Sequence, residues 1–256
     1  MNLHQGIESM RLVLLLLLVT STGYAQIIDS PRSMAMGAVK GDPVGSSAVI
    51  NNPAGMSRSY LYTAEMLYVR GAPGDLNVTG LNIVDSKTQP TMAVGVSYGF
   101  HFTDEKAPIS QKGHDGRIAF AHPAIPEKLN LGVSLRYLQI ERKQGVSDPE
   151  TLEGFTIDAG LLFSATPQFH VGLVGQNLVD LKDPSVPRRV GGGIAYTGKE
   201  LTLDVDLVMD LDQHPDGAKP ITAVGFEALL GGTVPLRGGF THDGVTEHRW
   251  VSGGIG

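Results

Sequence analysis

One motif in the sequence is of a kind that carries nucleophilic catalysis. Gly95-Val96-Ser97-Tyr98-Gly99 matches the G-x-S-x-G pattern of hydrolases, in which the serine lies on a sharp turn between a strand and a helix. Here an alternation of apolar and small residues continues unbroken through Phe102. We therefore interpret Ser97 as an ordinary strand residue. No catalytic residue is expected, and the sequence indicates a protein that is not an enzyme.

Metal, phosphate and nucleic-acid chemistry find no support either. The eight histidines are scattered and show no H-E-x-x-H spacing, and we assign His114-Asp115 and His242-Asp243 to turns. Gly191-Gly192-Gly193 precedes no expected helix, which a phosphate-binding loop needs. Cysteine is absent, and a net charge of −6 offers no basic face for nucleic acid. We expect no metal, no cofactor and no nucleic-acid partner.

Several charged residues fall on the polar side of alternating segments, where they would face the inside of a closed sheet. They are Arg136, Asp158, Arg189, Asp204, Asp206, Asp210, Glu227 and Arg237, and Arg249 is expected to join them. Two interpretations stay open. The charges form an ion-pair network that fills and stiffens the interior, because an unpaired buried charge costs several kcal/mol. Alternatively, they line a wet channel and select solutes by charge.

The elements that would position these charges are strands. From Met92 to Phe102 apolar residues alternate strictly with small or polar ones, and the same period recurs in 129–137, 155–163 and 201–211. A period of two places the two sets on opposite faces of a strand. Segments of about nine to eleven residues match a tilted strand that crosses the hydrocarbon of a membrane. Such strands must close into a barrel, since unpaired backbone groups cannot face lipid.

Composition agrees with this reading. Only 18% of the 256 residues are charged, against roughly 25% in soluble domains, and glycine, at 33 residues, suits tight turns and crowded strands. We predict an all-β protein, an antiparallel transmembrane β-barrel of about 10–14 strands over residues 60–256. A soluble β-sandwich would show the same alternation. The leader, the mean hydropathy of +0.01 and the glycine-rich polar face favour the membrane.

The first residues have the form of a secretory signal. Arg11 supplies positive charge, Leu12 to Val19 form an apolar core, and small residues lead to Ala25. We therefore predict a signal peptide at residues 1–25 and a mature protein in the bacterial outer membrane, with lipid as its first partner.

Residues 26–59 lack the alternation and are expected to form a segment at the mouth of the barrel or a plug inside it. A solvent-exposed loop that closes the first hairpin is the alternative. Small residues and turn formers mark this stretch: Ser33, Met34, Met36, Gly37, Asn51, Asn52, Pro53 and Gly55. Asn51 and Asn52 can bond their own backbone, and Pro53 ends any preceding helix.

The same stretch carries a resemblance. Arg32 to Ala38, followed by Asn51 to Met56, resembles the start of mature FadL-type and PorV-type outer-membrane proteins, and Val174 to Leu178 is similar to a recurring strand end of that family. The FadL likeness implies a passive conduit for small hydrophobic compounds, with the N-terminal segment as a hatch. The PorV likeness implies a non-conducting barrel that serves as a scaffold or shuttle subunit, with other envelope proteins of a secretion or motility complex as partners.

Overall fold

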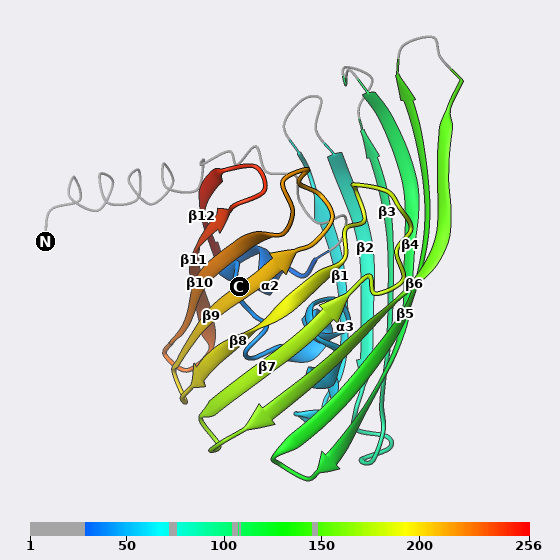
Figure 1. Cartoon of the computed structure of the whole chain (residues 1–256). Helices are drawn as coiled ribbons and strands as arrows, with labels where there is room; N and C mark the ends of the chain where they lie inside the picture. Colours follow the sequence, from blue (N-terminus) through cyan, green and yellow to red (C-terminus); the bar gives the residue numbers. More distant parts are fainter. Residues whose placement is uncertain (1–28, 72–75, 104–106, 108, 145–147) are drawn as a thin grey trace, which may run out of the picture.

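The computed structural model describes residues 29–71, 76–103, 107, 109–144 and 148–256. Twelve antiparallel strands form one curled sheet in which each strand pairs with its neighbours in sequence (Figure 1). The predicted all-β antiparallel fold with about 10–14 strands is therefore confirmed. Among the described residues, β1 and β12 are each paired on one side only. The expected signal peptide, residues 1–25, lies outside the described residues.

The strands differ in length, and the longest lie in the first half of the sheet. They are β1 (Tyr62–Val69), β2 (Leu76–Asp85), β3 (Ala93–Thr103), β4 (Ile109–Ile125), β5 (Leu129–Gln144), β6 (Glu150–Ser164), β7 (Phe169–Gln176), β8 (Arg189–Thr197), β9 (Leu201–Asp210), β10 (Lys219–Leu230), β11 (Val234–Asp243) and β12 (His248–Ile255). Short helical turns precede them, namely α2 (Pro31–Met36), η1 (Gly45–Ser47), α3 (Ala48–Asn51) and η2 (Pro53–Ser57). No helix in the described ranges is long and apolar enough to cross a membrane.

The alternation in the sequence separates the two faces of the sheet. On β9, Leu203, Val205 and Leu207 are about half exposed, at 45%, 54% and 53%, whereas the intervening Asp204 and Asp206 are buried. The apolar face points outward and the polar face points toward the interior of the curl. An apolar outer surface over a whole sheet is typical of transmembrane barrels.

The lengths of the connections differ between the two ends of the sheet. Outward-facing aromatic pairs lie midway along β5 and β6, Tyr137 with Phe155, and near the ends of β7 and β8, Phe169 with Tyr196. At the end where β4 meets β5, the connections have three or four residues (126–128, 165–168, 198–200, 231–233) except for 86–92, whereas the opposite end carries the two longest described connections, 177–188 and 211–218. Short turns are typical of the periplasmic end of such barrels and longer loops of the outer end.

Candidate functional site

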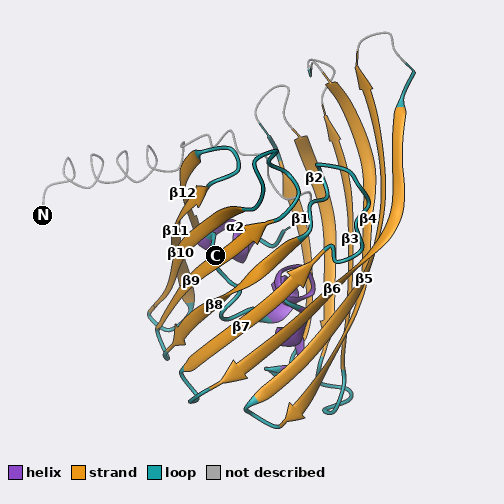
Figure 2. Cartoon of the chain, viewed as in Figure 1, coloured by secondary structure: helices purple, strands orange, loops and turns teal. Residues whose placement is uncertain are grey.

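Residues 29–59, here called the plug, lie inside the curl of the sheet (Figure 2). Residues 26–28 of the expected segment lie outside the described residues. The side chains of Met36, Val49, Ile50 and Ala54 are at most 1% exposed. Helix α2 packs on β10–β12, while η2 packs on β3–β6. The plug therefore spans the interior and touches the wall on both sides.

Local sequence explains how the plug starts. The Ser30 hydroxyl accepts the backbone N–H of Ser33, and the Ser33 side chain accepts the N–H of Ser30, which forms a capping box before Pro31. Gly37 ends α2 at φ 71°, a conformation that favours glycine. Met36 is fully buried, whereas Met34 remains 38% exposed.

The Asn-Pro stretch joins the plug to the wall. The Asn52 amide donates to the carbonyls of Leu161 on β6 and Leu173 on β7, at 3.2 and 3.1 Å. Asn51 lies inside the plug, where its amide donates to Asp29. A Cβ at Gly160 would lie 1.9 Å from the Asn52 side-chain oxygen, so the wall needs glycine there.

Other close approaches also require glycine. A Cβ at Gly132 would lie 2.3 Å from the Ala54 nitrogen, next to Pro53. Within the plug itself, a Cβ at Gly55 would lie 1.8 Å from the Pro43 carbonyl oxygen. Backbone therefore packs directly on backbone, which is why glycine-rich strands face the plug.

Two carboxylates of β9, Asp204 and Asp206, hold four successive backbone N–H groups of the plug. Asp206 accepts from Val39 and Lys40, at 2.9 and 3.1 Å. Asp204 accepts from Gly41 and Asp42, at 3.3 and 2.9 Å. Hydrogen bonds to a charged acceptor are roughly twice as strong as neutral ones. We call Asp204 and Asp206 the carboxylate pair; it is the main polar attachment of the plug.

Counter-charges surround the carboxylate pair. The Lys40 ammonium lies 3.9 Å from Asp206. Asp42 contacts Arg58 and lies 3.8 Å from Arg32. A further pair on the wall extends the group, because Glu227 bridges Arg32 at 3.6 Å and Arg237 at 2.6 Å. Lys40, Asp42 and Glu227 thus each have an oppositely charged group nearby, as buried charges require.

A second ion cluster lies on β4–β6. Asp115 binds Arg136 at 2.6 Å and Arg117 at 3.5 Å, and Arg117 lies 3.6 Å from Asp158. Arg117 also donates to the carbonyl of Ile50 in the plug, at 3.2 Å. This cluster contains two acids and two bases, and it too supports the plug.

The structure therefore divides the charges expected in the interior into separate groups. Arg189 pairs with Asp210 at 2.9 Å, at the end of β8 and β9 and away from the plug. The expectation that Arg249 faces the interior is wrong. Arg249 is exposed and lies on the opposite face of β12 from Ser252, whose hydroxyl donates to the Ala35 carbonyl of the plug.

The prediction that His114-Asp115 and His242-Asp243 form turns is wrong. For this reason Asp115 is not among the charges that the sequence predicts for the interior. His114 and Asp115 lie within β4, and His242 and Asp243 lie at the end of β11. Glycines at 113 and 116 interrupt the apolar alternation around Asp115. Polar residues and glycines that follow one another show no apolar period of two, which is the pattern that predicts a strand. Only the length of the neighbouring strands could have indicated a strand here.

Beyond Tyr137 the polarity of the wall is reversed. Leu138 and Ile140 face inward and are fully buried, while Gln139 and Glu141 face outward. One cross-sheet row of inward positions in this region is apolar except for one histidine: Val69, Val78, His101, Gly113, Ile140 and Leu152. The outer end of the interior is thus lined by apolar side chains.

The loop between β7 and β8, residues 177–188, folds over this apolar lining. Asn177 adopts φ 55° and its amide donates to the Pro187 carbonyl at 2.8 Å, which closes the base of the loop. Val186 is buried in the apolar cluster that contains Leu138 and Ile140, and Leu181 packs against that cluster. The loop therefore covers the outer end of the interior.

A salt bridge holds the same loop in place. Asp183 accepts two hydrogen bonds from Arg142 of β5, at 2.8 and 3.0 Å. Burial disfavours the Asp183 charge, but hydrogen bonds from Arg142 and Ser185 outweigh this effect and lower the pKa of Asp183 to about 2. The carboxylate is thus ionised over the whole physiological pH range.

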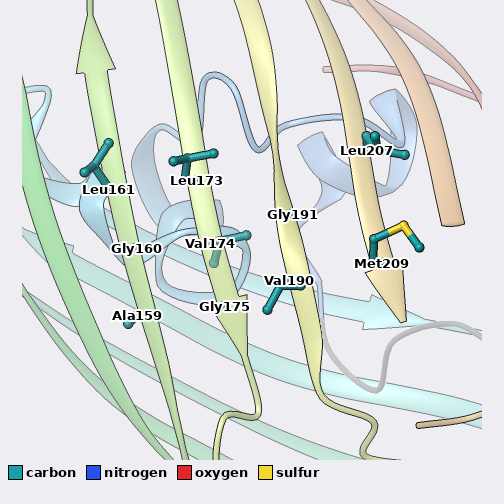
Figure 3. Close-up of a pocket in the computed structure, with 10 residues that line it drawn as sticks. All are labelled: Ala159, Gly160, Leu161, Leu173, Val174, Gly175, Val190, Gly191, Leu207 and Met209. Carbon is teal, nitrogen blue, oxygen red and sulfur yellow. The ribbon is translucent and has the colours of Figure 1, made fainter. Parts of the chain in front are cut away.

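A groove of about 650 Å³ crosses the outward face of β6–β9 (Figure 3). Leu161, Leu173, Val190, Leu207 and Met209 border it, and it also includes the small residues Ala159 and Gly175. The plug lies behind this part of the wall, on its inner side (Figure 3). The groove is apolar and opens toward the surroundings of the barrel rather than into the interior.

Comparisons with known proteins show the fold. The chain is similar to the crystal structure of a Pseudomonas aeruginosa FadL homologue, with a TM-score of 0.59 and 10% sequence identity, over 86% of this chain and 81% of that chain. No family model matches the sequence. No curated protein matches it either.

Proposed function

We propose that this protein is an outer-membrane barrel that conducts small apolar compounds passively, with the plug as its gate. The observation that carries the proposal is the plug itself. It fills the interior, yet hydrogen bonds and ion pairs hold it to the wall through the carboxylate pair and through Asn52. Contacts of this kind can be broken and remade without unfolding the barrel.

Two further features support an apolar solute. The outer end of the interior is lined by Leu138, Ile140 and their neighbours. In addition, regular pairing between β6 and β7 ends at Ala159 and Gly175, directly beside the apolar groove on the outward face. A solute that passed the wall at this point would enter the hydrocarbon of the membrane without crossing water. The FadL-like fold agrees with such a route.

The second candidate is a non-conducting barrel that serves as a scaffold or shuttle in an envelope complex. The ion pairs around Arg32, Asp42 and Glu227 favour it, because they fill the interior beside β8–β11 with paired, buried charges. A barrel filled in this way would be stiff and would offer its loops to partner proteins.

A reversible disulfide between plug and wall separates the two. A Cβ at Gly254 would lie 2.9 Å from the Ala35 Cβ, and a disulfide needs about 3.5–4.5 Å, so a small backbone shift suffices. The chain has no other cysteine. In Ala35→Cys with Gly254→Cys, oxidation should lower the rate of naphthalene uptake into proteoliposomes to that of protein-free liposomes, and reduction should restore it.

Each single-cysteine variant serves as the matched control and should conduct under both conditions. A wild-type rate no higher than that of protein-free liposomes, in a barrel shown to be folded by its heat-dependent gel mobility, would refute the conduit. Recovery of defined envelope proteins after crosslinking in intact cells would then support the scaffold.

A further inference from the structure

His101 is the one titratable member of the apolar row at the outer end of the interior. It is fully buried, and neither ring nitrogen has a hydrogen-bond partner among the described residues. Val78 and Gly113 flank it across the sheet. Burial of a polar group without a partner is unfavourable, because its hydrogen bonds to water are lost and not replaced. A leucine or phenylalanine would avoid this cost, so the histidine makes the closed state less stable than it could be.

The space around His101 is shaped for an imidazole that lies flat on the wall. A Cβ at Gly113 would lie 2.7 Å from two ring atoms of His101. The ring therefore covers the backbone of β4 and is fixed on that side. Ile140 and Leu152 continue the same row, so a molecule beside the ring would meet apolar side chains of the neighbouring strands along this row.

The β7–β8 loop packs against the apolar lining next to this row. Leu181 contacts the wall above Gly154, and Val186 is buried in the same cluster as Ile140. These are side chains of a loop rather than of a strand, and the Arg142–Asp183 bridge holds the loop closed. Movement of this loop would uncover the apolar row without breaking any strand pairing.

We propose that His101 and the apolar row form a binding site for an apolar compound that carries a single hydroxyl or carbonyl group, and that this compound replaces the side chains of the β7–β8 loop. A neutral imidazole has one donor and one acceptor nitrogen, so it can pair with one such group. The inference rests on the proposed function, because it names the class of solute that the conduit would take up.

The test compares two fluorescent probes that differ by one hydroxyl group, 1-naphthol and naphthalene. Binding is measured on the full chain in lipid nanodiscs, with the signal of empty nanodiscs subtracted. His101→Phe should weaken 1-naphthol binding about three- to tenfold, the range of one net hydrogen bond, and leave naphthalene binding unchanged. His101→Gln, which keeps a donor and an acceptor, should retain most of the 1-naphthol affinity.

Folding is checked by heat-dependent gel mobility, and His101→Leu replaces the phenylalanine variant if that one fails to fold. His114→Phe is the matched control, since this histidine bonds Tyr98 on the outward face. An equal loss for both probes, or no loss for 1-naphthol, would overturn the proposed role of His101.

The loop is tested separately. Arg142→Gln removes the bridge to Asp183 and should strengthen the binding of both probes, because a larger fraction of the protein is then open. Lys112→Gln, which removes an exposed bridge to Glu141, is its control. Unchanged affinities would show that the loop does not cover the site. Binding without any flux would refute the conduit and leave the site intact.

Discussion

Removal of one charge from the carboxylate pair should loosen the plug. In Asp206→Asn the amide keeps one acceptor oxygen for the N–H groups of Val39 and Lys40. One hydrogen bond to a charged acceptor is lost, which costs about 1.5–3 kcal/mol, and the Lys40 ammonium loses its partner at 3.9 Å. We expect plug docking to weaken by about 2–4 kcal/mol in total, or ~30–1,000-fold in the ratio of closed to open plug.

The absence of native cysteine makes this ratio measurable. Ala48 of the plug is fully buried, so in Ala48→Cys the rate of maleimide labelling follows the population of the released plug. Asp206→Asn should raise that rate within the stated range. Asp210→Asn is the matched control, because Asp210 is buried on the same face of β9 and bonds Arg189 instead of the plug. Equal labelling of the two aspartate variants would refute this account of the attachment.

Three further expectations follow from the wall and the loop. Gly193→Ala would place a methyl group 2.0 Å from an oxygen of the carboxylate pair and should raise labelling of the plug, whereas Gly116→Ala, which meets open space, should not. The pKa of Asp183 is lowered from 3.8 to about 2. The Arg142 bridge therefore stabilises the closed loop fully above about pH 4 and loses this effect as the pH falls toward 2. Cleavage of the loop by pepsin should increase as the pH falls from 4 to 2. Val205→Lys on the outward face should destabilise the barrel by about 2–4 kcal/mol in urea titrations in lipid.

The fold was predictable because alternation alone assigns residues to faces. The pattern Leu201 to Leu211 requires Asp204 and Asp206 to share the side opposite the leucines, whatever the sheet does elsewhere. Their binding partners were not predictable. The N–H groups that they hold belong to Val39 to Asp42, more than 160 residues away, and backbone donors carry no signature in a sequence.

The reversed polarity beyond Tyr137 shows a second limit. The alternation of Leu138 and Ile140 with Gln139 and Glu141 has the same period as the segment before it. Within the membrane the apolar residues of β5 face outward, and beyond it they face inward. The period of the alternation can be read from neighbouring residues alone. Which set of residues faces outward depends on whether lipid or water surrounds that part of the barrel. A reading from period alone therefore ends the strand at Tyr137 and misses the apolar row.

The ion cluster on β4–β6 connects the plug with the β7–β8 loop. Arg117 holds the Ile50 carbonyl of the plug and contacts Asp115. Asp115 binds Arg136, which donates to Asn177 at 2.7 Å at the base of the loop. Removing one partner from a buried ion pair costs about 3–5 kcal/mol, since it leaves a charge uncompensated. Movement at either end that pulls an arginine away would carry this cost, whereas a joint rearrangement keeps the charges paired. On the proposed gating function, we therefore expect this cluster to favour release of the plug together with opening of the loop over either change alone.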